Sequence, residues 1–316
     1  MLPSLGQRNP LGSPESGRTL GRNLLRDQLP LTTWILIGAV AQSAAVLLIP
    51  KVYAVLPAIF IFAYQVLDIF LMHKGYTRNR FMDKIVKGKF TGQIPSREGV
   101  FSSKPSNETV VCFLLIVRGN HPLGIFSEGF KDISRLAREM FKELNKNPHE
   151  HGFLGSKALL GAEESTSKNH LVNLMYFRSL EDVHKFAHGP LHAEAWRWWA
   201  STGKNYGYIT IGHELYASTQ NNWENIYVDS ELYGLPSTVT RVKKLSENGQ
   251  ETDGEWENVH PVIDARRGSW RSNTAEWTGQ DLMSLRCSLM KSIRISLTST
   301  RAVRRFTDGN SKVVDN

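Results

Sequence analysis

Residues 108–118, ETVVCFLLIVR, carry the strongest strand pattern in the sequence. From Val110 to Val117 every side chain is apolar, and several are β-branched. A continuous apolar run of strand length is typical of a strand whose two faces are both covered. The run therefore predicts a strand inside a sheet, and the segments that follow it decide the fold.

The segments after this strand alternate between helical and strand patterns. Apolar residues recur at helical spacing in the first of them, and Ser179 stands in the N-cap position of a later helix. Gly189 and Pro190 interrupt that later helix, because proline cannot continue it. The expected elements are a helix at Phe126–Leu144, strands at Phe153–Leu160 and His170–Phe177, helices at Leu180–His188 and Leu191–Ser201, and a strand at Tyr206–Ser218.

This order of strand, helix, strand, strand, helix, strand predicts a ferredoxin-like α+β domain over residues 105–235. Both helices would lie on one face of an antiparallel sheet. The other face would be uncovered in a monomer, and a second subunit is the usual cover. Because the sequence has no internal repeat, we expect a homodimer formed through the face that carries Tyr208, Thr210, Glu214 and Tyr216.

Two apolar segments precede this domain. Leu31–Ile49 contains no charged residue, and Val52–Met72 contains only Asp68, close to its end. At about 1.5 Å per residue, each is long enough to cross a hydrocarbon core of about 30 Å. Pro50 and Lys51 alone separate them, so the segments 31–49 and 52–72 predict an antiparallel transmembrane hairpin.

Basic residues flank the hairpin on both sides, and basic flanks favour the cytosolic side of a membrane. We therefore expect a multi-pass protein with both termini in the cytosol, in the endoplasmic reticulum. A cleaved signal peptide and a buried pair of core helices are the alternatives. The long polar stretch before the first segment disfavours the signal peptide, and the near absence of polar positions on any face disfavours the core helices. The flanking basic residues are Arg8, Arg18, Arg22 and Arg26 before the hairpin and Lys74, Arg78, Arg80, Lys84, Lys87 and Lys89 after it.

The formal net charge of +8 gathers beside the apolar segments and near the C-terminus. This placement indicates anionic lipid as the partner rather than nucleic acid. Only two cysteines are present, far apart in sequence, so a disulfide framework is not expected. The remaining segments are predicted as a disordered start (1–30), a basic juxtamembrane linker (73–104), an extension that docks on the domain (236–272), and a basic tail (273–316), either disordered or a membrane-surface helix.

Several cofactor motifs are absent from the sequence. It has no G-x-G-x-x-G or G-x-x-x-x-G-K-[ST] loop for a nucleotide, and no G-x-S-x-G nucleophile motif. Neither Cys112 nor Cys287 has the glycine-rich surroundings of a haem thiolate ligand. An enzyme built on this chain would therefore use few recognisable cofactor devices.

The segment HKFAHGPLHAEAWRWW (184–199) concentrates histidine and tryptophan. His192, Trp196 and Trp199 fall on one helical face, which we expect to be directed at the sheet. Aromatic walls around a few polar groups describe a small-molecule pocket, although a stripe of tryptophans is also common in a plain core. His184 and His188 have the i, i+4 spacing of metal ligands, but no third ligand is evident and we expect no metal.

In the strand after this segment, His213 alternates onto the same face as Ile209, Ile211 and Leu215. This places the imidazole between the sheet and the helices. A hydrogen-bonded core histidine and a catalytic histidine are both consistent with that position.

Two segments, HKFAHGPLHAEAWRWW (184–199) and YGYITIGHELYASTQNNWENIYVD (206–229), resemble a fungal family of antibiotic-biosynthesis-type monooxygenases that includes the fumagillin-pathway monooxygenase. The resemblance extends over residues 105–270. It implies a dimeric α+β barrel, a membrane hairpin before the domain, and oxygenation of a terpenoid or polyketide-derived intermediate in secondary metabolism.

The superfamily that this resemblance implies contains cofactor-free oxygenases and haem enzymes. A cofactor-free reaction with O₂ needs a base, a dry aromatic pocket and a donor to the developing oxyanion. We expect His213 and His192 to be catalytic, and Tyr176, His188, Trp196 and Trp199 to bind a lipophilic substrate, without flavin or nicotinamide. The alternatives are a haem-dependent lyase or peroxidase with His188, His192 or His213 as ligand, and a non-catalytic scaffold that binds a lipophilic ligand.

Overall fold

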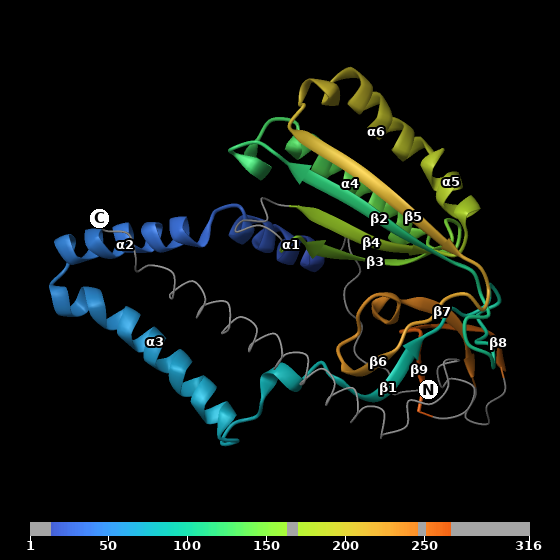
Figure 1. Ribbon diagram of the computed structural model, residues 1–316, viewed down its shortest axis with the longest axis horizontal. Helices are drawn as coiled ribbons and strands as arrows, with labels where there is room; N and C mark the ends of the chain where they lie inside the picture. The colour runs from blue at the N-terminus through green and yellow to red at the C-terminus, as the bar shows by residue number, and fades with distance from the viewer. Residues whose placement is uncertain (1–13, 163–169, 246–250, 267–316) are drawn as a thin grey trace, which may run out of the picture. The chain divides into compact units, whose positions relative to one another are not determined.

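A computed structural model describes residues 14–162, 170–245 and 251–266 of the 316-residue chain (Figure 1). The predicted basic tail at 273–316 lies outside the described residues. The described part is a mixed α+β structure with antiparallel sheets. Its elements form three groups: the N-terminal helices, a central sheet with its helices, and a small sheet with a hairpin.

The central sheet contains four antiparallel strands in the order β3-β4-β2-β5. The order of its elements along the chain is the one predicted from the sequence. The strands are β2 (Val110–Gly119), β3 (Phe153–Leu160), β4 (Leu171–Phe177) and β5 (Ile209–Ser218), and the helices are α4 (Phe130–Lys146), α5 (Leu180–Ala187) and α6 (Pro190–Ser201). Three short 3-10 turns, Gly124–Phe126, Gly203–Asn205 and Leu235–Ser237, lie between these elements or after them.

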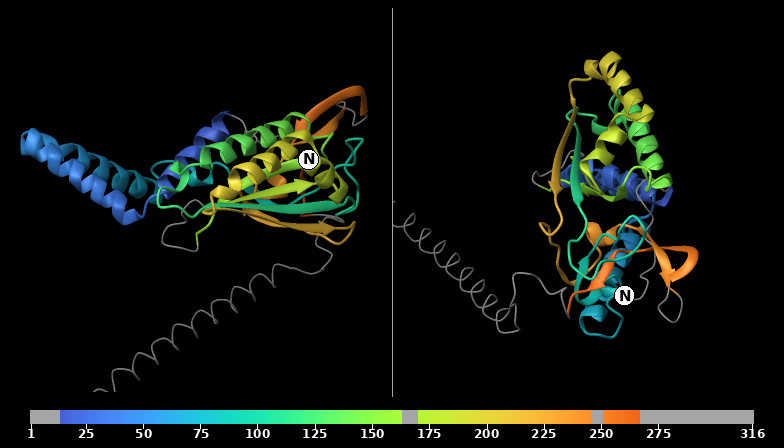
Figure 2. Two further views of the ribbon diagram at one scale, coloured as in Figure 1. Left: turned by 90° about the horizontal axis from the view of Figure 1, so that it is seen from above. Right: turned by 90° about the vertical axis from the view of Figure 1, so that its right-hand side faces the viewer.

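Strand register assigns each residue of the central sheet to one of two faces. Val111 pairs with Phe177 and with Ala217, and Leu115 pairs with Asn173 and with His213. These residues share the face that α4, α5 and α6 cover, as both views of Figure 2 show. The main core lies there and consists of Val111, Phe153, Met175 and Phe177 from the strands with Phe141, Leu144 and Val183 from the helices.

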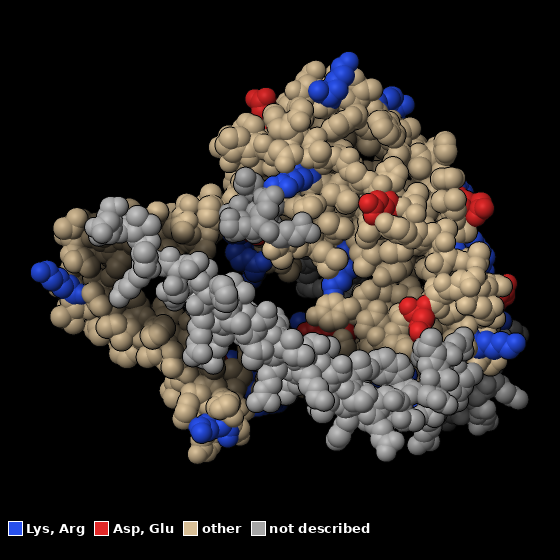
Figure 3. Space-filling view, in the orientation of Figure 1, with Lys and Arg blue, Asp and Glu red and all other residues tan. Residues whose placement is uncertain are grey.

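The opposite face of the sheet is covered only near one end. A second core of Ile94, Val110, Leu154 and Leu235 lies there, with Tyr176 and Trp223 packed against it. Farther along the same face Tyr216 is 55% exposed. Figure 3 shows few charged side chains on the part of this surface that lies over β2 and β5. The face is therefore partly open in the single chain.

A small sheet with the strand order β6-β1-β9 corrects the expectation of a linker at 73–104. Its strands are β1 (Val86–Gly92), β6 (Tyr227–Ser230) and β9 (Val262–Asp264), and Phe90 of β1 is fully buried in its core. The sequence pattern did not indicate this strand, because it contains Lys87 and Lys89 and only Val86 and Phe90 in it are large and apolar. Both partner strands come from distant parts of the chain, which no local pattern can indicate.

Strand β9 contributes Val262 to the buried cluster that also contains Phe90 and Leu232. Between β6 and β9 lies the hairpin of β7 (Thr240–Leu245) and β8 (Glu251–Val259).

Three helices precede the small sheet: α1 (Pro14–Asp27), α2 (Leu31–Leu48) and α3 (Lys51–His73), followed by a 3-10 turn at Arg80–Met82. Helices α2 and α3 are long and apolar enough to cross a membrane by length and composition. The side chain of Gln42 donates to the backbone oxygen of Ala54 at 3.0 Å, so the two helices are hydrogen-bonded to each other. Arg80 forms an ion pair with Asp68, the acidic residue of α3.

Helix α1 differs from the predicted disorder of residues 1–30. Its exposed arginines Arg18, Arg22 and Arg26 recur every four residues, while Leu20 and Leu24 are half-buried on another side. That spacing fits a helix with distinct basic and apolar sides, despite the glycines at 17 and 21.

Candidate active site

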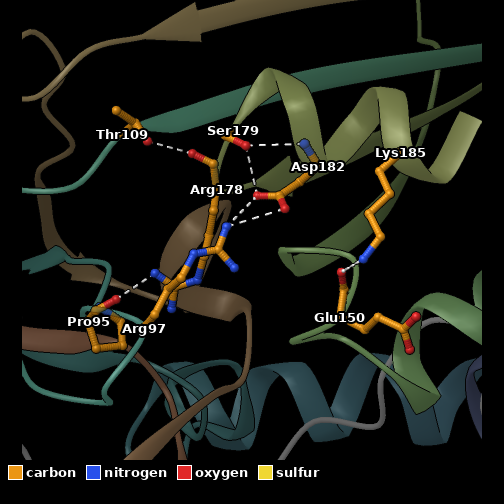
Figure 4. A network of polar contacts seen from close by, with 8 residues as sticks. All are labelled: Pro95, Arg97, Thr109, Glu150, Arg178, Ser179, Asp182 and Lys185. Atoms are coloured by element: carbon orange, nitrogen blue, oxygen red, sulfur yellow. Dashed lines mark hydrogen bonds and ion pairs between the residues drawn. The ribbon is translucent and has the colours of Figure 1, made fainter.

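Helix α5 is fixed at its start by its own cap and by an ion pair. Ser179 Oγ accepts from the backbone N–H of Asp182 at 3.1 Å and donates to the Asp182 carboxylate at 2.9 Å. Arg97 reaches the same carboxylate at 3.0 Å, as Figure 4 shows. This arrangement confirms the predicted N-cap and orients the helix that leads to the histidine segment.

Arg178, immediately before the cap, ties the end of β4 to neighbouring segments (Figure 4). Its side chain is 7% exposed and donates to the backbone oxygen of Pro95 at 2.7 Å, and Thr109 Oγ1 donates to the Arg178 carbonyl at 2.7 Å. Burial lowers the pKa of the guanidinium, and the nearby positive charge of Arg97 lowers it further. This network explains why α5 begins where it does.

His188 lies at the junction between α5 and α6, and one of its ring nitrogens is engaged in a hydrogen bond to the backbone. His188 caps α5, and its Nδ1 donates to the backbone oxygen of His184 at 2.7 Å. Pro190 then begins α6 as its first residue, where a missing N–H costs nothing. Within the described residues no group of three histidine, cysteine or acidic side chains is placed to hold a metal.

His192 lies in the first turn of α6 between two aromatic rings. Its ring centroid is 6.4 Å from that of Phe186 and 6.4 Å from that of Trp196. Nδ1 is buried and has no hydrogen-bond partner among the residues that the structure describes. Burial lowers the pKa of His192, a hydrogen bond to the backbone of Ala187 opposes this, and the charges of His213 and His188 lower it further. The lowered pKa favours the neutral imidazole, whose Nδ1 is a potential proton acceptor.

His213 projects from β5 on the side of the helices, as the alternation predicted, but its side chain is exposed. It stacks on Phe113 of β2 with a centroid distance of 5.5 Å and an interplanar angle of 26°. Its charge also lowers the pKa of His192. His213 is thus held by a ring on one face and accessible on the other.

The tryptophans of α6 do not form one wall. Trp196 is 60% exposed, with its ring near His192. Trp199 packs instead at the end of the helix, against Trp198 and so close to Gly203 that a Cβ there would lie 2.7 Å from the indole. No residue of α6 is fully buried, so the expectation that this face points into the sheet is wrong for Trp196.

Tyr176 lies on the other side of the sheet, and its assignment to the same pocket is wrong. It pairs with Cys112, which pairs with Tyr216, and all three belong to the face opposite the helices. Burial raises the pKa of its hydroxyl. Strand alternation alone separates it from Met175 and Phe177, which do face the helices.

The structure brings together His192, His213 and Trp196 with two rings that the sequence analysis did not select, Phe113 and Phe186. We call these five residues the helix-side cluster. Leu115 and Phe113 remain half-buried although they lie on an inner strand beneath the helix layer, and Ile211 on β5 is 43% exposed. The helices therefore leave apolar surface beside the two histidines accessible. The register of β2 against β5 is the signal that would have identified Phe113.

The central domain is similar in sequence to known proteins. Residues 110–235 match the sequence profile of the family described as monooxygenase af470-like. The chain is 29% identical over 232 residues to monooxygenase af470 of Aspergillus fumigatus, covering 73% of this chain and 82% of the relative.

Solved structures were also matched, at low similarity. They include Rv0793 from Mycobacterium tuberculosis, with 13% identity, a TM-score of 0.25 and coverage of 35% of this chain and 97% of that one. A conserved protein from Methanosarcina mazei matches with 12% identity, a TM-score of 0.24 and coverage of 38% and 94%. The sequence matches over the domain that carries the helix-side cluster show that this chain is similar to the monooxygenase af470-like family.

Proposed function

We propose that this protein is a membrane-anchored monooxygenase that oxygenates a lipophilic terpenoid or polyketide-derived intermediate without flavin or nicotinamide. The family match supports a monooxygenase-type reaction. The observation that carries the proposal is the setting of His192, whose buried Nδ1 has no hydrogen-bond partner among the described residues and lies in a cluster beside accessible apolar surface. A base in a partly desolvated aromatic setting is what a substrate-activated reaction with O₂ requires.

In this mechanism His192 Nδ1 removes a proton from an acidic C–H of the substrate. The resulting carbanion passes an electron to O₂, and the two radicals combine to form a C–O bond. The peroxide anion takes back the proton held by His192, and the resulting hydroperoxide loses water and leaves a carbonyl. The balance R₂CH₂ + O₂ → R₂C=O + H₂O needs no external reductant, because the substrate supplies all the electrons.

His213 has a different role in this proposal. Its stacking on Phe113 holds the ring, while its nitrogens remain accessible. A hydrogen bond from His213 to the substrate oxygen would stabilise the anion that forms when His192 takes the proton. Trp196 and His188, at the accessible rim of α6 and α5, would contact the apolar body of the substrate.

The proposal places the domain on a membrane. Helices α2 and α3 expose apolar side chains along their length, and the basic residues on both flanks favour the cytosolic side of the endoplasmic reticulum. A lipophilic substrate would then reach the domain from the bilayer. We further propose a homodimer that covers the open sheet face around Tyr216 and Glu214, where charged side chains are few (Figure 3).

The test is a deletion of the gene followed by metabolite profiling. We expect a less oxidised, lipophilic intermediate to accumulate. The purified full-length protein should convert that intermediate under ¹⁸O₂ with incorporation of one labelled oxygen, and His192→Gln should not. An unchanged metabolite profile would favour the non-catalytic scaffold. Stoichiometric Soret absorbance in active protein would contradict the cofactor-free reaction and favour the haem enzyme.

A further inference from the structure

The turn at residues 121–127, which we call the β2–α4 turn, presents two apolar side chains to solvent. Leu123 is 57% exposed and Phe126 is 65% exposed, whereas Ser127 beside them is buried. Side chains three residues apart in a 3-10 turn lie one above the other, so these two form a pair. Hydrogen bonds hold the shape: the N–H of Phe126 donates to the Leu123 oxygen at 3.0 Å, and Ser127 Oγ donates to the Gly124 oxygen at 2.7 Å. The turn therefore directs an apolar pair outward.

The β2–α4 turn is hydrogen-bonded to the segment that leads into the apolar helix α2. The backbone N–H of Ile125 donates to Gln28 Oε1 at 3.1 Å. Gln28 stands three residues before Leu31, the first residue of α2. Each residue of an extended chain spans at most about 3.6 Å, so Gln28 and Leu31 are no more than about 11 Å apart. Since α2 crosses a bilayer in the proposed function, the turn lies at the surface of that bilayer.

Helix α1 is connected to the same point of the chain. Trp34, in the first turn of α2, donates from Nε1 to the backbone oxygen of Arg26 at 2.9 Å. Tryptophan is enriched where a membrane meets water. Arg18, Arg22 and Arg26 are exposed and four residues apart, so they lie on one side of α1. The helix therefore presents a row of positive charge next to the start of α2, which is complementary to anionic lipid headgroups.

A lipid surface fits these features better than a protein partner does. A stable protein–protein interface buries about 800 Å² on each partner, far more than two side chains supply. Two side chains do suffice for shallow insertion when the chain is already anchored nearby. Glu128, two residues after Phe126, is exposed and would stay among the headgroups. Insertion would therefore be limited to the turn itself.

We propose that the β2–α4 turn inserts Leu123 and Phe126 into the interfacial layer of the bilayer, while the arginine row of α1 contacts anionic headgroups. This inference rests on the membrane anchor of the proposed function and adds a second contact, so that the domain is docked on the membrane as well as tethered to it. Helix α4 begins at Phe130, and its Arg135 is 3.6 Å from Glu194 of α6. Docking would thus fix the orientation of the helix layer relative to the bilayer.

The test measures the depth of a fluorescent label by nitroxide quenching. Leu123→Cys and Phe126→Cys are made separately in the full-length protein carrying Cys112→Ala and Cys287→Ala, and each is labelled with nitrobenzoxadiazole. The protein is reconstituted into vesicles of phosphatidylcholine and phosphatidylserine at about 3:1, with a nitroxide on the lipid acyl chain near the headgroup. We expect blue-shifted emission and quenching of about twofold or more at both positions.

Two further labelled positions serve as controls. Leu180→Cys is at an exposed position at the start of α5, just after the end of β4, where Phe177 pairs with Val111 at the beginning of β2. The β2–α4 turn follows the other end of β2, about 30 Å away, so this label should not be quenched. Phe60→Cys, in α3, reports the anchor and should be quenched. Glutamine in place of the three arginines of α1 should reduce quenching at Phe126→Cys to its level in phosphatidylcholine alone.

Each failure has a separate meaning. Quenching at Phe60→Cys without quenching at the turn would overturn the docking and leave the anchor in place. No quenching at any position would also remove the membrane anchor of the proposed function. Blue-shifted emission at the turn without nitroxide quenching would show that protein covers it and would overturn the lipid contact. Unchanged quenching in the glutamine variant would overturn the part assigned to α1.

Discussion

The imidazole of His213 is stacked on the ring of Phe113, with the ring centroids 5.5 Å apart and the planes inclined by 26°. The two residues come from adjacent strands but are not paired directly, since Phe113 faces Leu215 and His213 faces Leu115. The stack therefore connects two neighbouring cross-strand pairs, Phe113 with Leu215 and Leu115 with His213. It restricts the orientation of an otherwise exposed imidazole, which is what a precise hydrogen bond to a substrate requires.

His213→Ala should abolish turnover and leave folding nearly intact. The side chain is exposed, and substitutions at such positions typically change the free energy of unfolding by about 0.5 kcal/mol or less. Phe113→Leu should keep part of the activity, because the imidazole remains but is no longer stacked. Conversion of the accumulated intermediate measures turnover, and near-ultraviolet circular dichroism measures whether the fold is retained. Full activity of His213→Ala would remove this residue from the site.

His192 should make the protein acid-labile. Burial holds its pKa below the ordinary value, so the unfolded chain takes up the proton at higher pH than the folded one. The stability contribution is complete above the ordinary pKa of about 6.5 and is lost as the pH falls through the lower, folded-state value. Activity should fall over the same range, since protonated Nδ1 cannot act as a base. Melting temperatures and rates between pH 5 and 8 test this.

His149 provides the control for that experiment. Its pKa is also lowered, first by burial and then by the charges of Arg178, Arg241 and Arg97, but it lies outside the helix-side cluster. His149→Gln should weaken the pH dependence of stability and leave the pH profile of activity unchanged. His192→Gln should alter both. If the two variants have the same effect on activity, the base is elsewhere.

Loss of the α5 cap should destabilise the protein and reduce activity indirectly. Ser179→Ala removes the hydroxyl that accepts from Asp182, and capping serines typically contribute about 1 kcal/mol. Asp182→Ala should cost more, because it also leaves Arg97 without its carboxylate. Urea unfolding measures the loss of stability in each of the two variants. Glu181→Ala, one position away and exposed, is the control and should match the wild type.

A charge on the open sheet face should prevent dimer formation. Tyr216→Glu places a second carboxylate beside Glu214, to which Tyr216 now donates at 2.7 Å. Two like charges at the centre of a self-complementary interface would repel their copies in the other subunit. Light scattering in detergent should detect a dimer for the wild type and a monomer for the variant. Phe126→Glu, at an exposed position before α4, should stay dimeric; a monomeric wild type would contradict the proposal.

The elements with strong local patterns were predictable from sequence. Residues 153–160 form the predicted strand with the same bounds, and Ser179 caps the predicted helix. β1 was not predictable, because Lys87 and Lys89 mask it and its partner strands come from far along the chain. Helix α1 was not predicted, because a segment rich in glycine and arginine is typical of disorder.

The candidate site was predictable only in part. Alternation along β5 placed His213 on the side of the helices, and the composition of 184–199 indicated His192 and Trp196. Tyr176 was grouped with them because it is aromatic, although its neighbours Met175 and Phe177 show that it faces the other way. The place of Phe113 in the site depends on the register between strands, which a single sequence does not specify.

The small sheet has a consequence for how the protein is made. Strand β1 follows the apolar helices in the chain and is the central strand of that sheet. Its two edges can therefore be paired only once β6 and β9 have been made. The bond from Thr91 to Asn225 alone spans 134 residues. During synthesis, α2 and α3 leave the ribosome long before these partners exist. The proposed membrane hairpin would therefore have time to enter the bilayer first, and β1 can be paired on both edges only after the whole central sheet has emerged.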